Sequence, residues 1–152
     1  MSTKAKFVAD RDGIAYRVLG STMTVKANID ETGGVYEVVV AESPRGADIV
    51  THRHPWAESY YMLEGAIDVQ VGARRHHVGP GDFVTIPARA VHGFTVVTDV
   101  ARFLHVSIGG GATALFRDLN DHLPEPVQPD DVPVLLEVAA RHDIELVVPA
   151  GV

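Results

Sequence analysis

The sequence predicts an all-β fold, an antiparallel sandwich or barrel, followed by two short helices. Up to about residue 108, apolar and polar residues alternate in short runs, and turns rich in Gly and Pro separate these runs. After Gly109-Gly110-Gly111 the apolar residues recur with a helical period. Many short strands at this spacing are typical of sandwiches and barrels, and the jelly roll is the leading candidate.

The expected elements follow one another along a single domain, residues 1–152. The barrel core is expected at about 15–108 and the helical extension at about 112–152. Besides the strands that carry the histidines described below, alternation and β-rich composition predict strands at 23–29, 35–41, 67–71, 83–86, 91–97 and 101–108. The sequence contains no internal repeat that would indicate a second domain.

Two helices are expected in the extension. Leu115, Phe116 and Leu119 predict the first helix, and a proline-rich connector follows it. Asp130 or Asp131 is expected to cap the second helix. Its apolar stripe is formed by Val132, Leu135, Leu136 and Ala139, with Pro133 in the first turn, where a missing N–H costs little. We expect both helices to pack on the outside or the rim of the barrel.

The composition argues against several classes of function. The net charge of −7 argues against nucleic-acid binding, because phosphates need a basic face. The basic run Arg74-Arg75-His76-His77 is interpreted as a solvated strand edge. No apolar run is long enough to span a bilayer and no signal segment is evident at the start, so we expect no membrane partner. The absence of cysteine excludes disulfides and thiolate ligands and fits a reducing cytoplasm.

Four side chains with metal-binding atoms stand at strand spacing: His52, His54, Glu58 and His92. His52 and His54 are two residues apart, so on a strand both point to the same face. Buried polar groups without partners are costly, so four that converge need a shared partner. Three imidazoles and one carboxylate suit one divalent transition metal ion (Fe, Mn, Ni, Co or Cu) and leave open positions for water, oxygen or substrate. His105 lies on the last expected strand, and the sequence leaves open whether its side chain faces the cavity, the core or a dimer partner.

The residues around these ligands resemble the cupin family. The segment GADIVTHRHPWAESYYMLEG resembles the first cupin motif at each defining position, and GDFVTIPARAVHGFTV resembles the second. In the second motif Arg89 stands where glycine is usual and Val96 where asparagine is frequent. Nearly the whole chain is similar to small single-domain cupins described as quercetin 2,3-dioxygenase-like. The resemblance implies a cupin jelly-roll (double-stranded β-helix) barrel and a metal site, and it says little about the substrate.

Strand parity extends the site beyond the ligands. Residues two and four positions along a strand share a face, so the side chains expected beside Glu58 and His92 are Tyr60, Met62, Phe94 and Val96. We predict that these four bind substrate, because an apolar and aromatic lining with a phenol suits a flat organic molecule. The alternative is that they simply fill the barrel, as interior side chains of small barrels usually do.

Three hypotheses for the function remain open. The first is a metal-dependent dioxygenase that uses O2 on an aromatic or enolic small molecule. In the quercetinases that the chain resembles, the glutamate is both a metal ligand and a base, so the resemblance implies that Glu58 is the catalytic residue. The second keeps the metal as a Lewis acid, as in polyketide cyclases, isomerases, decarboxylases and lyases. The third is a non-catalytic small-molecule-binding protein. A homodimer is also expected, because the apolar strands at 23–29 and 35–41 need a cover, unless the C-terminal helices provide it.

Overall fold

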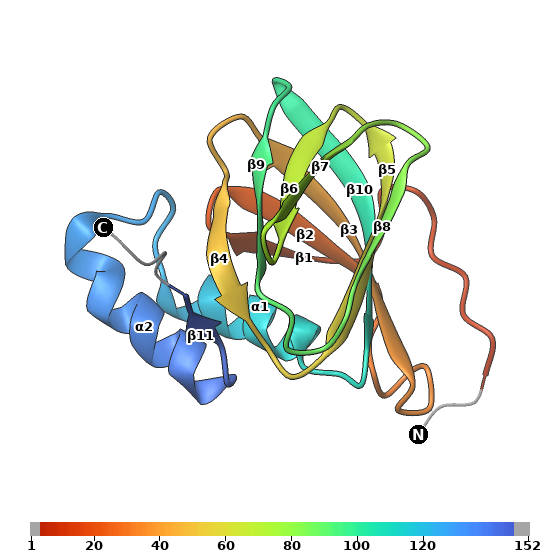
Figure 1. The fold of residues 1–152 in the computed structure, drawn as a ribbon. Helices are drawn as coiled ribbons and strands as arrows, with labels where there is room; N and C mark the ends of the chain where they lie inside the picture. The colour runs from red at the N-terminus through yellow and green to blue at the C-terminus, as the bar shows by residue number, and fades with distance from the viewer. Residues whose placement is uncertain (1–3, 148–152) are drawn as a thin grey trace.

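The fold consists of two antiparallel sheets that face each other (Figure 1). The computed structural model describes residues 4–147. The six-stranded sheet has the order β1-β2-β3-β10-β5-β8 and the five-stranded sheet the order β11-β4-β9-β6-β7. The strands of the first sheet are β1 (Ile14–Val18), β2 (Ser21–Ala27), β3 (Tyr36–Pro44), β10 (Val100–Ile108), β5 (Ala57–Glu64) and β8 (Phe83–Ile86). Those of the second are β11 (Glu145–Leu146), β4 (Ile49–Arg53), β9 (His92–Val96), β6 (Ile67–Val71) and β7 (Arg74–Val78).

The core lies between the inner faces of the two sheets. Val39 and Phe103 of the six-stranded sheet and Ile67 and Val69 of the five-stranded sheet are fully buried. The alternation that predicted the strands thus reflects one face in the core and one in solvent, as expected for antiparallel sheets.

Two helices and a short 3-10 turn follow the barrel. They are α1 (Ala112–His122), η1 (Pro129–Asp131) and α2 (Val132–Arg141). Figure 1 shows α1 across one end of the barrel and α2 beside β4 and β11. Phe116 and Leu119 on α1 and Val138 on α2 are buried and join the core. Neither described helix is long and apolar enough to cross a bilayer.

The first turn of α1 is held by a residue from the sheet. The N-cap position is Gly111, which has no side chain to offer. Glu37 on β3 supplies the acceptor instead: its Oε2 accepts the backbone N–H groups of Ala112 at 3.0 Å and Thr113 at 3.3 Å. A β-carbon at Gly111 would lie 2.8 Å from the Trp56 ring, so only glycine lets the chain pass there. Sheet and helix are therefore joined through a buried carboxylate.

The all-β fold with two C-terminal helices is confirmed. The expected strands 67–71 and 83–86 coincide with β6 and β8, and the expected second helix has Pro133 in its first turn. Two details differ. Asp131 stands at the N-cap of α2, but its carboxylate accepts the N–H of Gln128 at 2.8 Å and does not cap that helix. After α2 the chain adds an unexpected strand, β11, and residues 148–152 of the expected extension lie outside the described residues.

Candidate metal centre and cavity

The two sheets bring three histidines together on the inner side of β4 and β9. His52 on β4 is the register partner of His92 on β9, and His54 directly follows β4. The ring centroids of His52 and His92 are 4.4 Å apart, and those of His54 and His92 are 4.8 Å apart. Each histidine offers a ring nitrogen, and the three nitrogens lie within 4.8 Å of one another. This is the spacing of ligands around one ion.

The three rings are oriented by the backbone. The Nδ1 of His52 donates to the carbonyl of Val50 at 2.8 Å, and the Nδ1 of His92 donates to that of Ala90 at 2.9 Å. The Nδ1 of His54 donates to the carbonyl of Trp56 at 2.9 Å. In each ring a backbone carbonyl fixes the Nδ1 proton, which leaves Nε2 as the ligand atom. Metal-binding histidines are commonly oriented in this way, so the residues fit a divalent metal ion.

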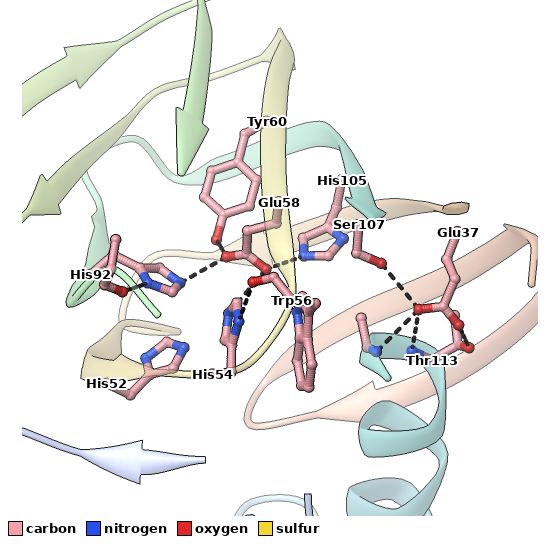
Figure 2. Close-up of polar contacts among 12 residues, drawn as sticks. Glu37, His52, His54, Trp56, Glu58, Tyr60, His92, His105, Ser107 and Thr113 are labelled. Carbon is pink, nitrogen blue, oxygen red and sulfur yellow. Dashed lines mark hydrogen bonds and ion pairs between the residues drawn. The ribbon is translucent and has the colours of Figure 1, made fainter. Parts of the chain in front are cut away.

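Glu58 on β5 lies against this group and accepts several hydrogen bonds (Figure 2). Its Oε1 accepts from the Nε2 of His92 at 2.8 Å and from the Tyr60 hydroxyl. Its Oε2 accepts from the Nε2 of His105 at 2.9 Å and lies 3.3 Å from the Nε2 of His54. The carboxylate thus stands beside the three-histidine group. Its role as a fourth metal ligand stays a prediction.

The charges of the site follow from these contacts. Burial by itself raises the pKa of the Glu58 carboxyl, but the charge and hydrogen bond of His105 and the bonds from His54 and His92 outweigh it and hold the pKa well below its usual range. Burial, and then the Glu58 charge, raise the pKa of the Tyr60 phenol well above its usual value. Glu58 is therefore ionised and Tyr60 protonated at neutral pH.

The histidines differ in charge. Burial, together with the nearby His92, lowers the pKa of His52 to about 4, so the His52 imidazole is neutral at pH 7. Burial is the largest single influence on His92 and lowers its pKa, but the hydrogen bond and charge of Glu58 and the bond to the Ala90 carbonyl together outweigh burial and raise the pKa. The His92 Nε2–H shared with Glu58 thus occupies the place where a cation would bind.

His105 completes the carboxylate's surroundings. It is a register partner of Tyr60, is 5% exposed, and lines the cavity described below. The sequence alone left the facing of the His105 side chain open, because that facing depends on how β10 pairs with β5. The Nδ1 of His105 and the indole N–H of Trp56 are buried without a hydrogen-bond partner. Trp56 stacks on His54 with ring centroids 4.2 Å apart and also lines the cavity.

A cavity of about 360 Å³ opens next to the histidines. Of the four predicted substrate-binding residues, Tyr60 and Phe94 line it. Met62 and Val96 do point inward, but they are 0% and 3% exposed in the core and do not line the cavity. For these two the structure agrees with the alternative that they fill the barrel.

The walls of the cavity come from the barrel and the C-terminal extension together. The barrel contributes the histidines and aromatic rings, whereas the extension contributes only apolar side chains: Leu115, Phe116, Leu119, Val127, Leu135, Leu136, Ala139, Ile144 and Leu146. The cavity is therefore polar beside Glu58 and apolar where the helices close it. Its volume lies within the about 300–1,000 Å³ common for small-molecule sites.

Comparisons with known proteins cover the barrel and its site. The family model of the cupin domain matches residues 39–107. Over 91 residues, 59% of this chain, the sequence is 33% identical to the quercetin 2,3-dioxygenase of Bacillus subtilis (strain 168). The match spans 27% of that protein's length.

Solved structures have a similar fold. KdgF from Halomonas sp. superposes with a TM-score of 0.63 at 18% identity, over 70% of this chain and 94% of that one. The polyketide cyclase RemF from Streptomyces resistomycificus superposes with a TM-score of 0.62 at 25% identity, over 69% of this chain and 80% of that one. The cupin-domain match ends at residue 107, before the extension that supplies the apolar wall.

Proposed function

Because this chain belongs to the cupin family, we propose that it is a metal-dependent enzyme, specifically a dioxygenase that acts on an aromatic or enolic small molecule. The observation that carries the proposal is the group of three histidines whose ligand nitrogens lie within 4.8 Å of one another beside a buried carboxylate. An apolar cavity with aromatic walls adjoins it. The 33% identity to a quercetin 2,3-dioxygenase supports the oxygenase as the reaction type.

In this proposal the ion is Fe, Mn, Ni, Co or Cu, held by His52, His54 and His92 with Glu58 as the fourth ligand. When bound, such an ion supplies an electrophilic centre with open coordination positions for a substrate hydroxyl or O2. Availability rather than the ligand set decides which of these metals is bound.

Glu58 is the proposed base. It is ionised and lies in the polar part of the cavity, where an acidic hydroxyl of the substrate would bind. Tyr60 and His105 donate to its two oxygens and hold the carboxylate in place. A proton taken from the substrate would rest on Glu58, and the resulting enolate would be the electron-rich form that reacts.

A second candidate is a non-redox, metal-dependent reaction such as a cyclisation. The observation that favours it is the likeness to the polyketide cyclase RemF, which spans 80% of that chain. Both candidates use the same histidines and the same carboxylate, so they differ in whether oxygen is consumed.

Oxygen consumption therefore separates the two. The protein is dialysed against chelator, reloaded with each of the five metals and supplied with flavonols and other enols in an oxygen electrode. We expect oxygen uptake equal to substrate loss, and no turnover under nitrogen. Full turnover under nitrogen would favour the cyclase. Tight binding without turnover under any condition would favour a non-catalytic binding protein.

Glu58→Gln tests the base in the same assay. The amide oxygen still coordinates a metal, but the amide does not accept the proton. We expect turnover to fall by about 10²–10⁴-fold, the usual contribution of a general base, while substrate affinity changes little. Normal turnover in this variant, at full metal content, would show that Glu58 is not the base.

A further inference from the structure

The polar groups at the base of the cavity are nearly closed to solvent. His54, Glu58 and His92 are 3%, 4% and 1% exposed. Atoms that a water molecule barely reaches are still less accessible to a larger solute, so part of the cavity wall must move before a ligand can contact them. Local opening takes place where a segment has few buried contacts. The segment that moves can therefore be found from how firmly each part of the wall is held.

The two helices of the wall are held by buried side chains. Phe116 on α1 is buried, and Val138 on α2 is fully buried. α2 then ends in a capped turn, in which the N–H of Ile144 donates to the carbonyl of Ala139 at 3.0 Å. The firm anchoring of the C-terminal extension therefore reaches as far as Ile144.

The next residues, 145–147, contain no buried side chain. We call these three residues the strap; they comprise β11 and Val147. β11 is only two residues long and lies at the edge of the five-stranded sheet, next to β4. Leu146 lines the cavity and is the register partner of His52. The strap thus covers the cavity beside a predicted metal ligand.

Polar contacts between exposed groups hold the strap on β4. The Arg53 guanidinium donates to both carboxylate oxygens of Glu145, at 2.8 Å and 2.6 Å. The hydrogen bond from Arg53 and then the charges of Arg53 and Arg89 lower the pKa of the Glu145 carboxyl, which is therefore ionised at neutral pH. Beyond Leu146, the N–H of Val147 donates to the Thr51 carbonyl at 3.0 Å, and the Thr51 hydroxyl donates to the Val147 carbonyl at 2.8 Å.

These contacts are weak compared with those of the helices. The side chains of Arg53 and Glu145 are 44% and 59% exposed, and an ion pair between exposed side chains contributes little and is screened by salt. Movement of the strap away from β4 would uncover no fully buried side chain, whereas movement of α2 would uncover Val138. The strap is therefore the part of the cavity wall that is held least firmly.

We propose that the strap is the gate of the cavity: it moves away from β4 to admit a ligand and returns to close over it. The charges of Arg53, Arg89 and Glu145 form a clasp that keeps the gate shut. Arg89 stands where glycine is usual in the second cupin motif, so this departure from the motif supplies a charge to the clasp. The inference concerns access to the cavity and goes beyond the proposed reaction, because it holds for a dioxygenase, a cyclase or a binding protein alike.

Quenching of tryptophan fluorescence by acrylamide measures the opening of the gate. Trp56 is the single tryptophan of the chain, lines the cavity and is 6% exposed. Acrylamide is small and uncharged, and its quenching requires neither metal nor turnover. The full chain is measured as purified and after chelator treatment, so failure of the proposed function and failure of the gate are observed separately.

The first variant locks the gate with a disulfide, Arg53→Cys with Glu145→Cys. The chain has no other cysteine, so only one disulfide can form. The two residues are register partners, and the Cα atoms of directly opposed residues lie about 4.5–5.5 Å apart, which a disulfide spans. We expect the oxidised protein to lose most of the acrylamide quenching and the reduced protein to regain it. Equal quenching of the two forms would overturn the proposal.

The second variant, Glu145→Arg, opens the clasp by placing like charges together. Its quenching constant should exceed that of the wild type about two- to fivefold, the change expected when an exposed ion pair is lost. Adding Arg53→Glu restores an ion pair and should bring the quenching back toward the wild type. The matched control is Asp99→Arg, which breaks the exposed pair of Arg45 and Asp99 away from the cavity and changes the net charge equally. This control should be quenched like the wild type.

The charge variants decide the question even if the cysteine variant does not fold or oxidise. Quenching of Glu145→Arg no greater than that of Asp99→Arg would overturn the gate. A charge-swapped double variant that is quenched as strongly as Glu145→Arg would overturn the clasp.

Discussion

Replacing Glu37 by alanine should destabilise the protein strongly, although the residue is remote from the metal ligands in sequence. Glu37 is 1% exposed. Its carboxylate accepts the N–H groups of Ala112 and Thr113, the Ser107 hydroxyl at 3.0 Å and the Thr113 hydroxyl. Alanine removes the acceptor for all four donors and leaves a cavity in the sheet.

The magnitude follows from those four bonds. A helix N-cap contributes about 1 kcal/mol, and hydrogen bonds to a charged group contribute about 1.5–3 kcal/mol each, though not additively. The two hydroxyls can rotate toward other partners, whereas the two buried N–H groups cannot. We therefore expect a loss of about 3–5 kcal/mol in the free energy of unfolding. For a domain of this size, 1 kcal/mol changes Tm by about 2–4 °C, so Tm should fall by about 10 °C.

Thermal and urea unfolding followed by circular dichroism measure the loss. The matched control is Glu42→Ala, an exposed glutamate on the same strand, β3, which should change Tm by no more than about 2 °C. Glu37→Gln, which keeps one carbonyl acceptor, should lie between the control and Glu37→Ala. A Tm for Glu37→Ala equal to that of the control would refute the idea that this carboxylate anchors α1.

Three further predictions concern the metal and assembly. Substituting His52 and His92 together by alanine should abolish stoichiometric metal, measured by elemental analysis after chelator dialysis; full metal retention would contradict the site. Metal affinity should fall as the pH falls through the raised pKa of His92, because the ion must displace the proton that His92 shares with Glu58. His52, with a pKa of about 4, is already neutral in this range. A metal Kd that does not change between pH 8 and pH 5 would contradict this prediction. The protein should be a homodimer that pairs through the outer side of β2 and β3, where Tyr36 is 41% exposed, and light scattering that gives a monomer across micromolar concentrations would exclude it.

The sequence by itself determined which residues point into the barrel. A strand has a side-chain period of two, so the facing of Glu58, Tyr60 and Met62 follows from their spacing alone, and the structure buries all three. The same local rule placed His92, Phe94 and Val96 on one face, and all three are buried on β9. The helical period likewise predicted a first helix from Leu115, Phe116 and Leu119, and α1 buries Phe116 and Leu119.

Only the tertiary structure decided which inward residues meet and how deep each one lies. His105 reaches Glu58 because β10 pairs with β5 in one register, and a shift by one residue would turn its side chain to the other face. Met62 and Val96 have the predicted facing but lie too deep in the core to line the cavity. Leu146 reaches His52 through a pairing of strands that are 94 residues apart at these positions. Local periodicity fixes the direction of a side chain, whereas the distance between two side chains depends on strand order and register, which arise from long-range packing.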